Sequence, residues 1–342
     1  MARDPLGATL GRMKIAHVRE RNAPAGASWR LAAALEGDGR RWLDLEEARL
    51  ALVDRDARLA HNSPLFRQPV TTLDDHLARG LRVDALAELL DAEPDDDARL
   101  AAADLAFGPP ILSPPSLRDF YAFEQHVATM WKRRGGEVPE AWYQLPIFYF
   151  SNVSEIRGPG DPVKAPKGSD ELDYELEVAA LVDTPVHDVD AITGEQAIGG
   201  YMIFNDWSAR DLQREETTVR LGPAKGKDFA SSIGPWLVTP DELADARNGT
   251  AYDLAMTATV NGQETTRGTW STAQFSFGQM IERASADVRL RPGDLIGSGT
   301  VGTGCLLEIR DATLGRYLEP GDEVSVSIER LGTLTSPVVE RA

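Results

Sequence analysis

The sequence is poor in three features that would assign it to other classes of protein. It contains one cysteine, Cys305, in 342 residues, so no internal disulfide can form and nothing requires an oxidising compartment. No segment approaches the ~20 consecutive apolar residues that cross a bilayer, and the N-terminus lacks the apolar core of a secretion signal. We therefore expect a cytoplasmic protein that does not associate with membranes.

Basic residues are scarce relative to acidic ones. The chain has 36 Lys and Arg against 54 Asp and Glu, which gives a formal net charge of −18. Nucleic-acid-binding proteins contact the phosphate backbone through clustered Lys and Arg, so this balance argues against a nucleic-acid partner. Hydrophobic residues make up 42% of the chain, which is enough apolar material for a large buried core.

The composition changes at residues 107–115, where four of nine residues are proline. Short strand patterns followed by helical periodicity predict a small α+β domain over residues 1–105. β-type segments bounded by Gly, Pro and Asp predict a mainly β domain with a few helices over residues 106–342. The fold class is therefore α+β, mainly β. Because Met13 opens the first strand pattern, residues 1–12 are either a leader or start-site artefact or a part of the natural protein, and both alternatives stay open.

Residues 172–182 carry the most informative chemical pattern. Side chains alternate along a strand, so Asp173, Glu175 and Glu177 are expected to share one face. Two neighbouring glutamates repel each other unless a cation lies between them or their face is solvated. The segment alone leaves both interpretations open.

Two further acidic residues favour the metal interpretation. Asp206 ends an apolar strand pattern over residues 199–206, and Asp119 follows the proline-rich segment. Ligands that are all oxygen suit a hard cation such as Mg²⁺, Mn²⁺ or Ca²⁺, and the lack of His or Cys in these segments disfavours structural zinc.

Of the five histidines, His126 stands apart because it lies seven residues after Asp119 among aromatic residues. A structural histidine and a general base are both consistent with this context. His126 can act as a general base because an unperturbed imidazole, with a pKa of ~6.5, can take a proton from water at neutral pH.

Residues 297–302 match the G-x-G-x-x-G pattern of dinucleotide-binding loops, but residues 305–314 read as a strand where that loop requires a helix. We therefore exclude a dinucleotide site. Cys305, at the start of this expected strand, has no histidine near it in the sequence, which favours a buried and inert thiol.

Several segments, in the same order and at similar spacing, resemble the fumarylacetoacetate hydrolase family. They are DFYAFEQH, LPIFYF, DYELEVAALV, FNDWSARDLQ, GPAKGKDFASSIGPW and GDLIGSGTVGTGCLLE. The resemblance covers roughly residues 110–335 and is to bacterial members with a small additional N-terminal domain. It implies a β-roll or sandwich built around a metal site, usually in a homodimer, and a role in the catabolism of aromatic compounds.

The resemblance also implies roles for individual residues. The metal carboxylates would be Asp119, Glu175, Glu177 and Asp206, holding Mg²⁺ or else Mn²⁺ or Ca²⁺. The catalytic residues would be His126 as general base, Glu308 as the acid that orients it, and Lys227 and Gln213 as donors to developing negative charge. The substrate contacts would be Tyr121, Tyr149, Arg210 and Thr300. An arginine that the family pattern places shortly after the catalytic histidine has two candidates, Arg133 and Arg134.

The implied activity is metal-dependent hydrolysis of the carbon–carbon bond of a 1,3-diketo acid, an acylpyruvate or fumarylacetoacetate-like compound, through a metal-bound enolate. Two alternatives stay open: an isomerase, tautomerase or decarboxylase of a related 2-oxo or hydroxydienoic acid, and a binding protein without activity. The expected partner is a small-molecule diketo or oxo acid.

Overall fold

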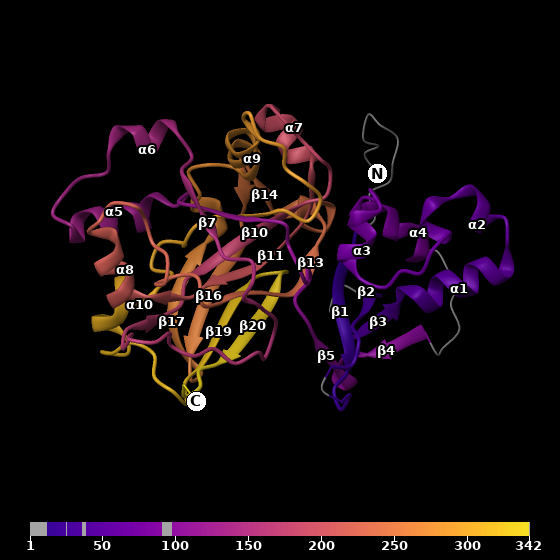
Figure 1. Cartoon of the computed structure of the whole chain (residues 1–342), viewed down its shortest axis with the longest axis horizontal. Coiled ribbons are helices and arrows are strands. Elements are labelled where there is room, and N and C mark those ends of the chain that lie inside the picture. The colour runs from indigo at the N-terminus through magenta and orange to yellow at the C-terminus, as the bar shows by residue number, and fades with distance from the viewer. Residues whose placement is uncertain (1–11, 25, 36–38, 91–97, 342) are drawn as a thin grey trace.

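The computed structural model describes residues 12–24, 26–35, 39–90 and 98–341. Nearly all of the segment interpreted as a leader or a start-site artefact lies outside these residues. Figure 1 shows the N-terminal residues, in indigo, beside a larger body formed by the rest of the chain. Within the described ranges, no helix combines the length and the apolar character needed to cross a membrane.

One large sheet of twelve strands runs through both parts of the chain. Its order is β4-β3-β2-β1-β13-β11-β10-β18-β6-β7, with β5 paired to β1 and β8 paired to β13. The strands are β1 (Lys14–Glu20), β2 (Arg30–Ala34), β3 (Arg41–Asp44), β4 (Arg99–Ala101), β5 (Leu105–Phe107), β6 (Leu117–Phe120), β7 (Phe148–Ser151), β8 (Ile156–Arg157), β10 (Leu176–Val182), β11 (Ile198–Asp206), β13 (Ser231–Val238) and β18 (Leu295–Gly297). Because β1 pairs with β13, the sheet is continuous across the predicted boundary near residue 105, and the division into two domains remains a prediction.

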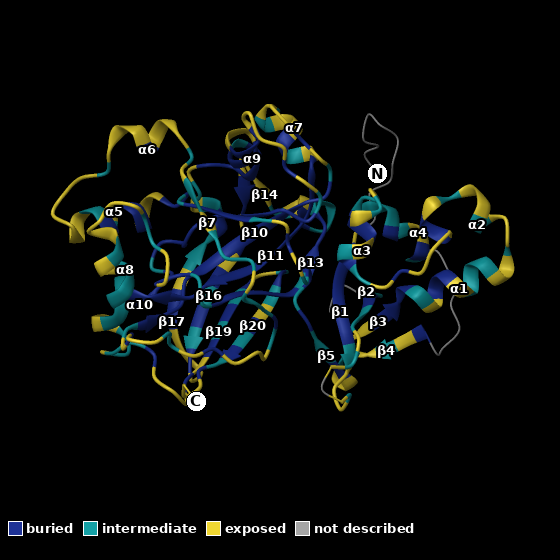
Figure 2. Ribbon diagram, in the orientation of Figure 1, coloured by how far each residue is buried: buried dark blue, intermediate teal, exposed yellow. Residues whose placement is uncertain are grey.

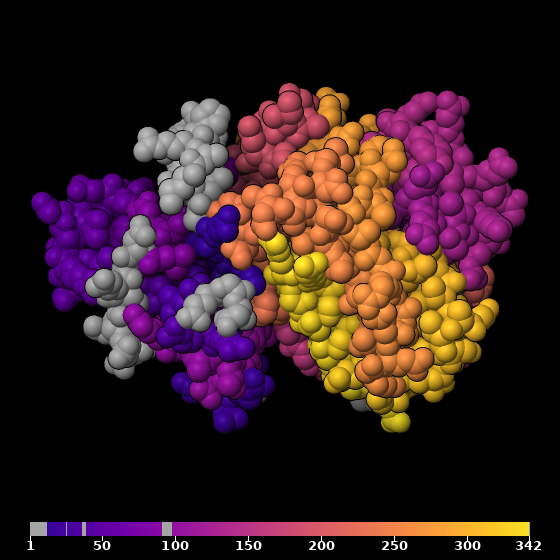
Figure 3. Space-filling model, turned by 180° about the vertical axis from the view of Figure 1, so that it is seen from behind, coloured from indigo at the N-terminus to yellow at the C-terminus, as the bar shows by residue number. Residues whose placement is uncertain are grey.

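A second, antiparallel sheet has the order β17-β16-β19-β20. Its strands are β16 (Ala255–Val260), β17 (Gln263–Thr269), β19 (Glu323–Ile328) and β20 (Gly332–Pro337). Figure 3 shows the orange and yellow segments that include these strands on the surface of the larger body. Two short pairs complete the strands, β9 (Leu172–Asp173) with β12 (Ser208–Ala209) and β14 (Arg247–Asn248) with β15 (Ala251–Tyr252). The predicted class, α+β and mainly β, is confirmed.

The helices are short and lie mostly around the sheets (Figure 1). The α-helices are α1 (Leu45–Arg55), α2 (Leu59–Asn62), α3 (Leu73–Ala78), α4 (Ala87–Leu90), α5 (Glu124–Arg133), α6 (Glu140–Gln144), α7 (Ala191–Gln196), α8 (Arg210–Thr217), α9 (Phe277–Ser285) and α10 (Leu306–Ile309). The 3₁₀ helices are η1 (Pro64–Phe66), η2 (Val83–Leu86), η4 (Ala102–Asp104), η5 (Pro240–Ala246), η6 (Trp270–Thr272) and η7 (Arg310–Ala312).

Helix starts follow local sequence signals. Asp44 caps α1 by accepting hydrogen bonds from the backbone N–H groups of Glu46 and Glu47. Helix α9 begins with a capping box in which Ser276 and Gln279 each accept a hydrogen bond from the other's backbone N–H. Such caps satisfy N–H groups that have no partner inside the helix, which is why these ends can be read from the sequence.

Strand β10 separates the two main hydrophobic cores. Leu176, Val178, Ala180 and Val182 point into the core shared with the four-stranded sheet. Ala179 and Leu181 point into the core that lies against the N-terminal helices. Figure 2 shows β10 and its neighbours as the most deeply buried part of the larger body. The acidic residues of this segment therefore lie in the interior, and the solvated-face interpretation is wrong.

The strand predicted over residues 305–314 is also wrong, because this segment forms helix α10 followed by η7. The carboxylate of Asp173 accepts hydrogen bonds from the backbone N–H groups of Leu306, at 2.7 Å, and Leu307, at 2.9 Å. This cap comes from a residue distant in the sequence, so local sequence pattern gave no sign of it. The sequence analysis excluded a dinucleotide loop because it expected a strand after residues 297–302, and that reason fails. The exclusion still holds, because α10 has only four residues and is far shorter than the helix of a dinucleotide-binding unit.

Candidate metal centre and active site

Two antiparallel strands bring three of the predicted metal carboxylates together. Glu177 of β10 pairs with Phe204 of β11, so Asp206, two residues further along β11, lies on the same face as Glu177. Glu175 immediately precedes β10, and its carbonyl accepts a hydrogen bond from the backbone N–H of Asp206. The alternation predicted for Glu175 and Glu177 is thus preserved at the end of the strand.

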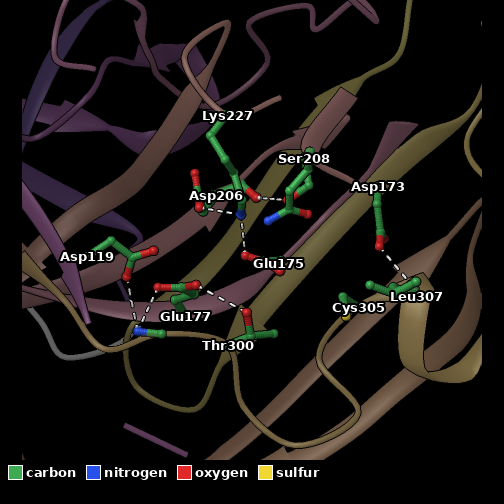
Figure 4. Close-up of polar contacts among 12 residues, drawn as sticks. Asp119, Asp173, Glu175, Glu177, Asp206, Ser208, Lys227, Thr300, Cys305 and Leu307 are labelled. Carbon is green, nitrogen blue, oxygen red and sulfur yellow. Dashed lines mark hydrogen bonds and ion pairs between the residues drawn. The ribbon is translucent and has the colours of Figure 1, made fainter. Parts of the chain in front are cut away.

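The fourth carboxylate, Asp119, comes from β6, which pairs in parallel with β18. Its partner there is Gly297, where a Cβ atom would approach Asp119 Oδ1 to 2.7 Å. The loop after β18 then holds two of the acids together. The N–H of Gly299 donates to Asp119 Oδ1 at 3.1 Å and to Glu177 Oε2 at 2.9 Å, and the hydroxyl of Thr300 donates to Glu177 Oε1 at 3.3 Å. Figure 4 shows these contacts.

Lys227, in the turn before β13, lies between two of the acids (Figure 4). Its Nζ atom is 2.5 Å from Glu175 Oε2 and 2.5 Å from Asp206 Oδ2, and the hydroxyl of Tyr149 also donates to Asp206. Burial would lower the pKa of Lys227, but the charges of Asp206 and Glu175 outweigh it and raise this pKa above its ordinary value. Lys227 therefore stays protonated at neutral pH.

Within the described part of the chain, Asp119 and Glu177 lack a cation of this kind beside them. Burial, followed by the charge of Asp206, raises the pKa of Asp119 to about 8, and burial raises the pKa of Glu177 well above its ordinary value. Burial would also raise the pKa of Glu175, but the charges of Lys227 and Arg210 hold it well below its usual range. The positive charges of Lys227 and Arg210 are therefore too few for all four acids to ionise together.

A hard divalent cation fits this set of residues. Ligand atoms of Asp119, Glu177 and Asp206 lie within 4.8 Å of one another, and all three residues are buried. Asp206 Oδ1 is buried without a hydrogen-bond partner among the described residues. Carboxylate oxygens are the donors that such cations prefer, and a cation would favour the ionised state of all three acids.

Arg210, the first residue of α8, is held inside the protein by three side chains. Its guanidinium donates to Asp173 at 2.7 Å, to Glu175 at 2.8 Å and to Gln213 at 3.0 Å. A planar guanidinium with several fixed donors holds a carboxylate in one orientation. Arg210 therefore positions Glu175, a role that its own sequence segment did not indicate.

His126, on α5, faces Glu308, on α10. The Nδ1 atom of His126 lies 2.9 Å from Glu308 Oε2, and both side chains are buried. The ring of Tyr121 packs edge-on against the imidazole, with centroids 5.4 Å apart. The other ring nitrogen of His126 is the one left for the cavity that this histidine lines.

A cavity of about 230 Å³ connects these groups. Ten of the twelve predicted site residues line it: Asp119, Tyr121, His126, Tyr149, Glu175, Glu177, Arg210, Gln213, Lys227 and Thr300. The remaining two, Asp206 and Glu308, lie behind the wall and contact Lys227 and His126, respectively.

Sequence reasoning missed part of the cavity wall. Phe120, Met130, Ile147, Phe148, Pro223, Gly299 and Leu307 also line it. The apolar members carry no pattern that separates them from core residues, whereas Gly299 lies in the glycine-rich loop that was considered only for dinucleotide binding. Of the two candidate arginines, Arg134 lines the cavity, and Arg133 donates to the backbone carbonyl of Glu308.

Comparison with known families gives one match over most of the larger body. Residues 116–339 match the family described as fumarylacetoacetate (FAA) hydrolase C-terminal. Among curated proteins, the chain is 34% identical over 198 residues to 2,4-didehydro-3-deoxy-L-rhamnonate hydrolase from a Sphingomonas strain. That match covers 57% of this chain and 65% of the relative, so it spans less than two thirds of that protein's length.

Solved structures share the fold over nearly the whole chain. Fumarylacetoacetate hydrolase from Exiguobacterium antarcticum is 23% identical, with a TM-score of 0.68, and the match covers 96% of this chain and all of that one. The 5-carboxymethyl-2-hydroxymuconate delta-isomerase from Mycobacterium smegmatis is 25% identical, with a TM-score of 0.63 and the same coverage. The fold expected from the resemblance is confirmed.

Proposed function

Because this chain belongs to the fumarylacetoacetate hydrolase family, we propose that it is a divalent-metal-dependent hydrolase that cleaves the carbon–carbon bond of a 1,3-diketo acid. The proposal rests above all on one observation. A buried histidine–glutamate pair, His126 and Glu308 at 2.9 Å, adjoins the same cavity as the cluster of buried carboxylates. Hydrolysis needs a base for water next to an electrophilic centre, and this cavity brings the two kinds of group together.

In this proposal, Asp119, Glu175, Glu177 and Asp206 hold the cation, with Mg²⁺ as the expected ion and Mn²⁺ or Ca²⁺ as alternatives. When bound, the cation supplies Lewis acidity, which polarises the oxygens of a chelating diketo acid. Glu308 keeps the proton on Nδ1 of His126, so that Nε2 carries the lone pair. His126 then removes a proton from a water molecule, and the hydroxide adds to the carbonyl carbon.

The developing negative charge needs donors that are fixed before the reaction. Lys227 Nζ is charged and held in place by Glu175 and Asp206, and Gln213 is held by Arg210. A preorganised donor of this kind contributes ~3–4 kcal/mol to transition-state stabilisation. Cleavage of the carbon–carbon bond releases an enolate, which takes up a proton to give the second acid product.

The charged end of the substrate has two candidate partners. Arg210 was predicted to contact the substrate, but its guanidinium already contacts three side chains. Arg134 lines the cavity, is exposed, and makes no side-chain hydrogen bond or ion pair within the described part of the chain. We propose that Arg134 binds the carboxylate of the substrate and that Tyr121, Tyr149 and Thr300 contact its remainder.

Isomerisation is the second candidate, since one structural neighbour carries the name of a delta-isomerase. An isomerase, tautomerase or decarboxylase would use the same polarising cavity without adding water across a carbon–carbon bond. The presence of both His126 and Glu308 favours hydrolysis over these reactions, and a binding protein without activity would need neither residue.

The test is product analysis with a panel of acylpyruvates and fumarylacetoacetate in the presence of Mg²⁺. We expect two acid products from one diketo acid, and we expect His126→Gln to abolish their formation while metal binding persists. His187→Gln is the matched control, because His187 also lies 2.9 Å from a carboxylate, that of Asp188, but both side chains are about half exposed. One isomeric product would favour the isomerase, and no turnover of any compound would contradict an enzymatic role.

A further inference from the structure

The pair formed by His126 and Glu308 has a third neighbour, the only cysteine in the sequence. Cys305 precedes α10, and its Sγ atom lies 3.7 Å from Glu308 Oε2, the same oxygen that lies 2.9 Å from His126 Nδ1. Ligand atoms of the three residues lie within 4.8 Å of one another. The absence of a histidine beside Cys305 in the sequence was therefore misleading, because the fold supplies one.

These three side chains are buried, and His126 Nδ1 and Glu308 Oε1 lack a hydrogen bond of good geometry among the described residues. Cys305 is fully buried, His126 is 4% exposed, and the side chain of Glu308 is 2% exposed. Glu308 Oε1 has no hydrogen-bond partner among the residues that the structure describes. Buried carboxylate oxygens without a partner are rare in folded proteins, and a bound ion is one of the groups, beside water, that can satisfy them.

We propose that His126, Cys305 and Glu308 form a second metal site, which takes a thiophilic ion such as Zn²⁺ and is chemically distinct from the carboxylate cluster. Thiolate and imidazole ligands select Zn²⁺ or Co²⁺, whereas the all-oxygen cluster selects Mg²⁺, Mn²⁺ or Ca²⁺. Three protein ligands leave one tetrahedral position open for a fourth ligand such as water.

The sulfur–oxygen distance is close to that of a tetrahedral zinc site, whereas the nitrogen–oxygen distance is shorter. Zn–S and Zn–O bonds of ~2.3 and ~2.1 Å place sulfur and oxygen about 3.6 Å apart, against 3.7 Å in the structure. The His126 Nδ1 to Glu308 Oε2 distance would lengthen from 2.9 Å to about 3.4 Å. Binding replaces the thiol proton of Cys305, which is released to solvent.

Occupation of this site would stop the proposed reaction. A metal on Nδ1 forces the imidazole proton onto Nε2, so the nitrogen that faces the cavity can no longer accept a proton from water. This consequence rests on the proposed function. The metal site itself does not, and it can be tested without any substrate.

The experiment titrates Co²⁺ into metal-stripped protein that has first been saturated with Mg²⁺. Near-ultraviolet charge-transfer absorption from a cobalt–thiolate bond reports only Cys305, since the chain has no other cysteine. We expect this absorption to saturate at one equivalent of Co²⁺ and to disappear when Zn²⁺ is added. His126→Gln and Glu308→Gln retain the thiol and are each expected to weaken Co²⁺ binding at least tenfold.

His187→Gln again serves as the control and should bind Co²⁺ as tightly as the unsubstituted protein. Absence of the charge-transfer absorption at saturating Co²⁺ would overturn the proposal, and that measurement needs no variant that could misfold. The proposal also fails if Mg²⁺ prevents the absorption, because Co²⁺ would then need the carboxylate cluster. It fails equally if neither His126→Gln nor Glu308→Gln changes the affinity.

Discussion

The Nδ1 atom of His126 lies 2.9 Å from Oε2 of Glu308, across the contact between helices α5 and α10. Helix α10 starts where it does because Asp173 caps it, and Asp173 also binds Arg210, which holds Glu175. The pair and the carboxylate cluster are therefore linked through a chain of buried polar contacts.

Replacing Glu308 by Gln should lower kcat by about 10²-fold or more. Glutamine is similar in size, but it lacks the charge that stabilises the protonated imidazole after proton transfer from water. The dissociation constant for Mg²⁺ should stay within about twofold, because Glu308 lies outside the carboxylate cluster. Steady-state kinetics and metal titration on the same preparation check both expectations, and an unchanged kcat would show that the pair has no part in catalysis.

Replacing Asp119 by Asn should stabilise the metal-free protein by about 1–2 kcal/mol and abolish its response to Mg²⁺. Asp119, Glu177 and Asp206 are buried within 4.8 Å of one another, and asparagine removes one of the three acids while retaining Oδ1 as an acceptor for Gly299. Thermal unfolding with EDTA and with Mg²⁺ gives the comparison. A similar rise in Tm with Mg²⁺ in both proteins would rule out this cluster as the cation site.

Gly299→Ala should destabilise the protein by ~1–3 kcal/mol and weaken metal binding. Gly299 has a φ of +79°, and a Cβ there would lie 2.4 Å from the carbonyl oxygen of Phe120. The shift needed to relieve this contact moves the N–H that donates to Asp119 and Glu177.

Gly315→Ala is the matched control for this substitution. Gly315 has a φ of +69°, but a Cβ added there would meet no atom within 4 Å, so the position carries the backbone strain without the close approach. Isothermal titration with Mg²⁺ should show weaker binding only for Gly299→Ala. Equal Mg²⁺ affinity in the two variants would show that the close approach at Gly299 does not affect metal binding, and that any loss of stability comes from backbone strain.

The contribution of His17 to folding stability should fall as the pH drops below about 6.5, opposite in sign to that of Asp119 and Glu177, whose raised pKa values add stability as the pH falls. Its Nδ1 lies 2.8 Å from the carbonyl oxygen of Pro109, and its Nε2 accepts a hydrogen bond from the N–H of Leu73. Burial lowers the pKa of His17 below 6.5. The folded state therefore favours the neutral imidazole of His17.

A histidine with a lowered folded pKa binds fewer protons in the folded state than in the unfolded state. Its contribution to stability is therefore complete above the unfolded pKa and declines as the pH falls, by at most ~1.4 kcal/mol per pH unit. In His17→Gln this part of the slope should vanish, leaving the contribution of His76, whose pKa burial also lowers, and the opposing contribution of the buried acids Asp119 and Glu177. Urea unfolding between pH 5 and pH 8 measures the slope, with His61→Gln as an exposed control, and an unchanged slope in His17→Gln would refute the assignment.

Local pattern was sufficient for some parts of the site. The alternation of Glu175 and Glu177 and the acidic end of β11 at Asp206 follow from strand geometry, which survives burial. The fold class followed from strand and turn signals in the same way. The roles assigned to Lys227, Gln213 and Glu308 came from family resemblance alone, because nothing in their own segments indicates chemistry.

Other parts of the site depend on contacts between distant segments. Asp119 reaches the cluster only because β6 pairs with β18 opposite Gly297, and α10 exists because Asp173 caps it. The approach of Cys305 to His126 has the same origin. Such relationships are set by strand order and register, which neither composition nor periodicity specifies.

The most direct test of the central claim measures loss of the ultraviolet absorbance of an acylpyruvate by protein stripped of metal with EDTA, before and after Mg²⁺ is restored. We predict no loss without metal, and rapid loss with Mg²⁺ accompanied by two acid products in equal amounts. Equal rates of cleavage with and without metal, or loss of absorbance with no cleavage products, would contradict metal-dependent carbon–carbon bond hydrolysis by this protein.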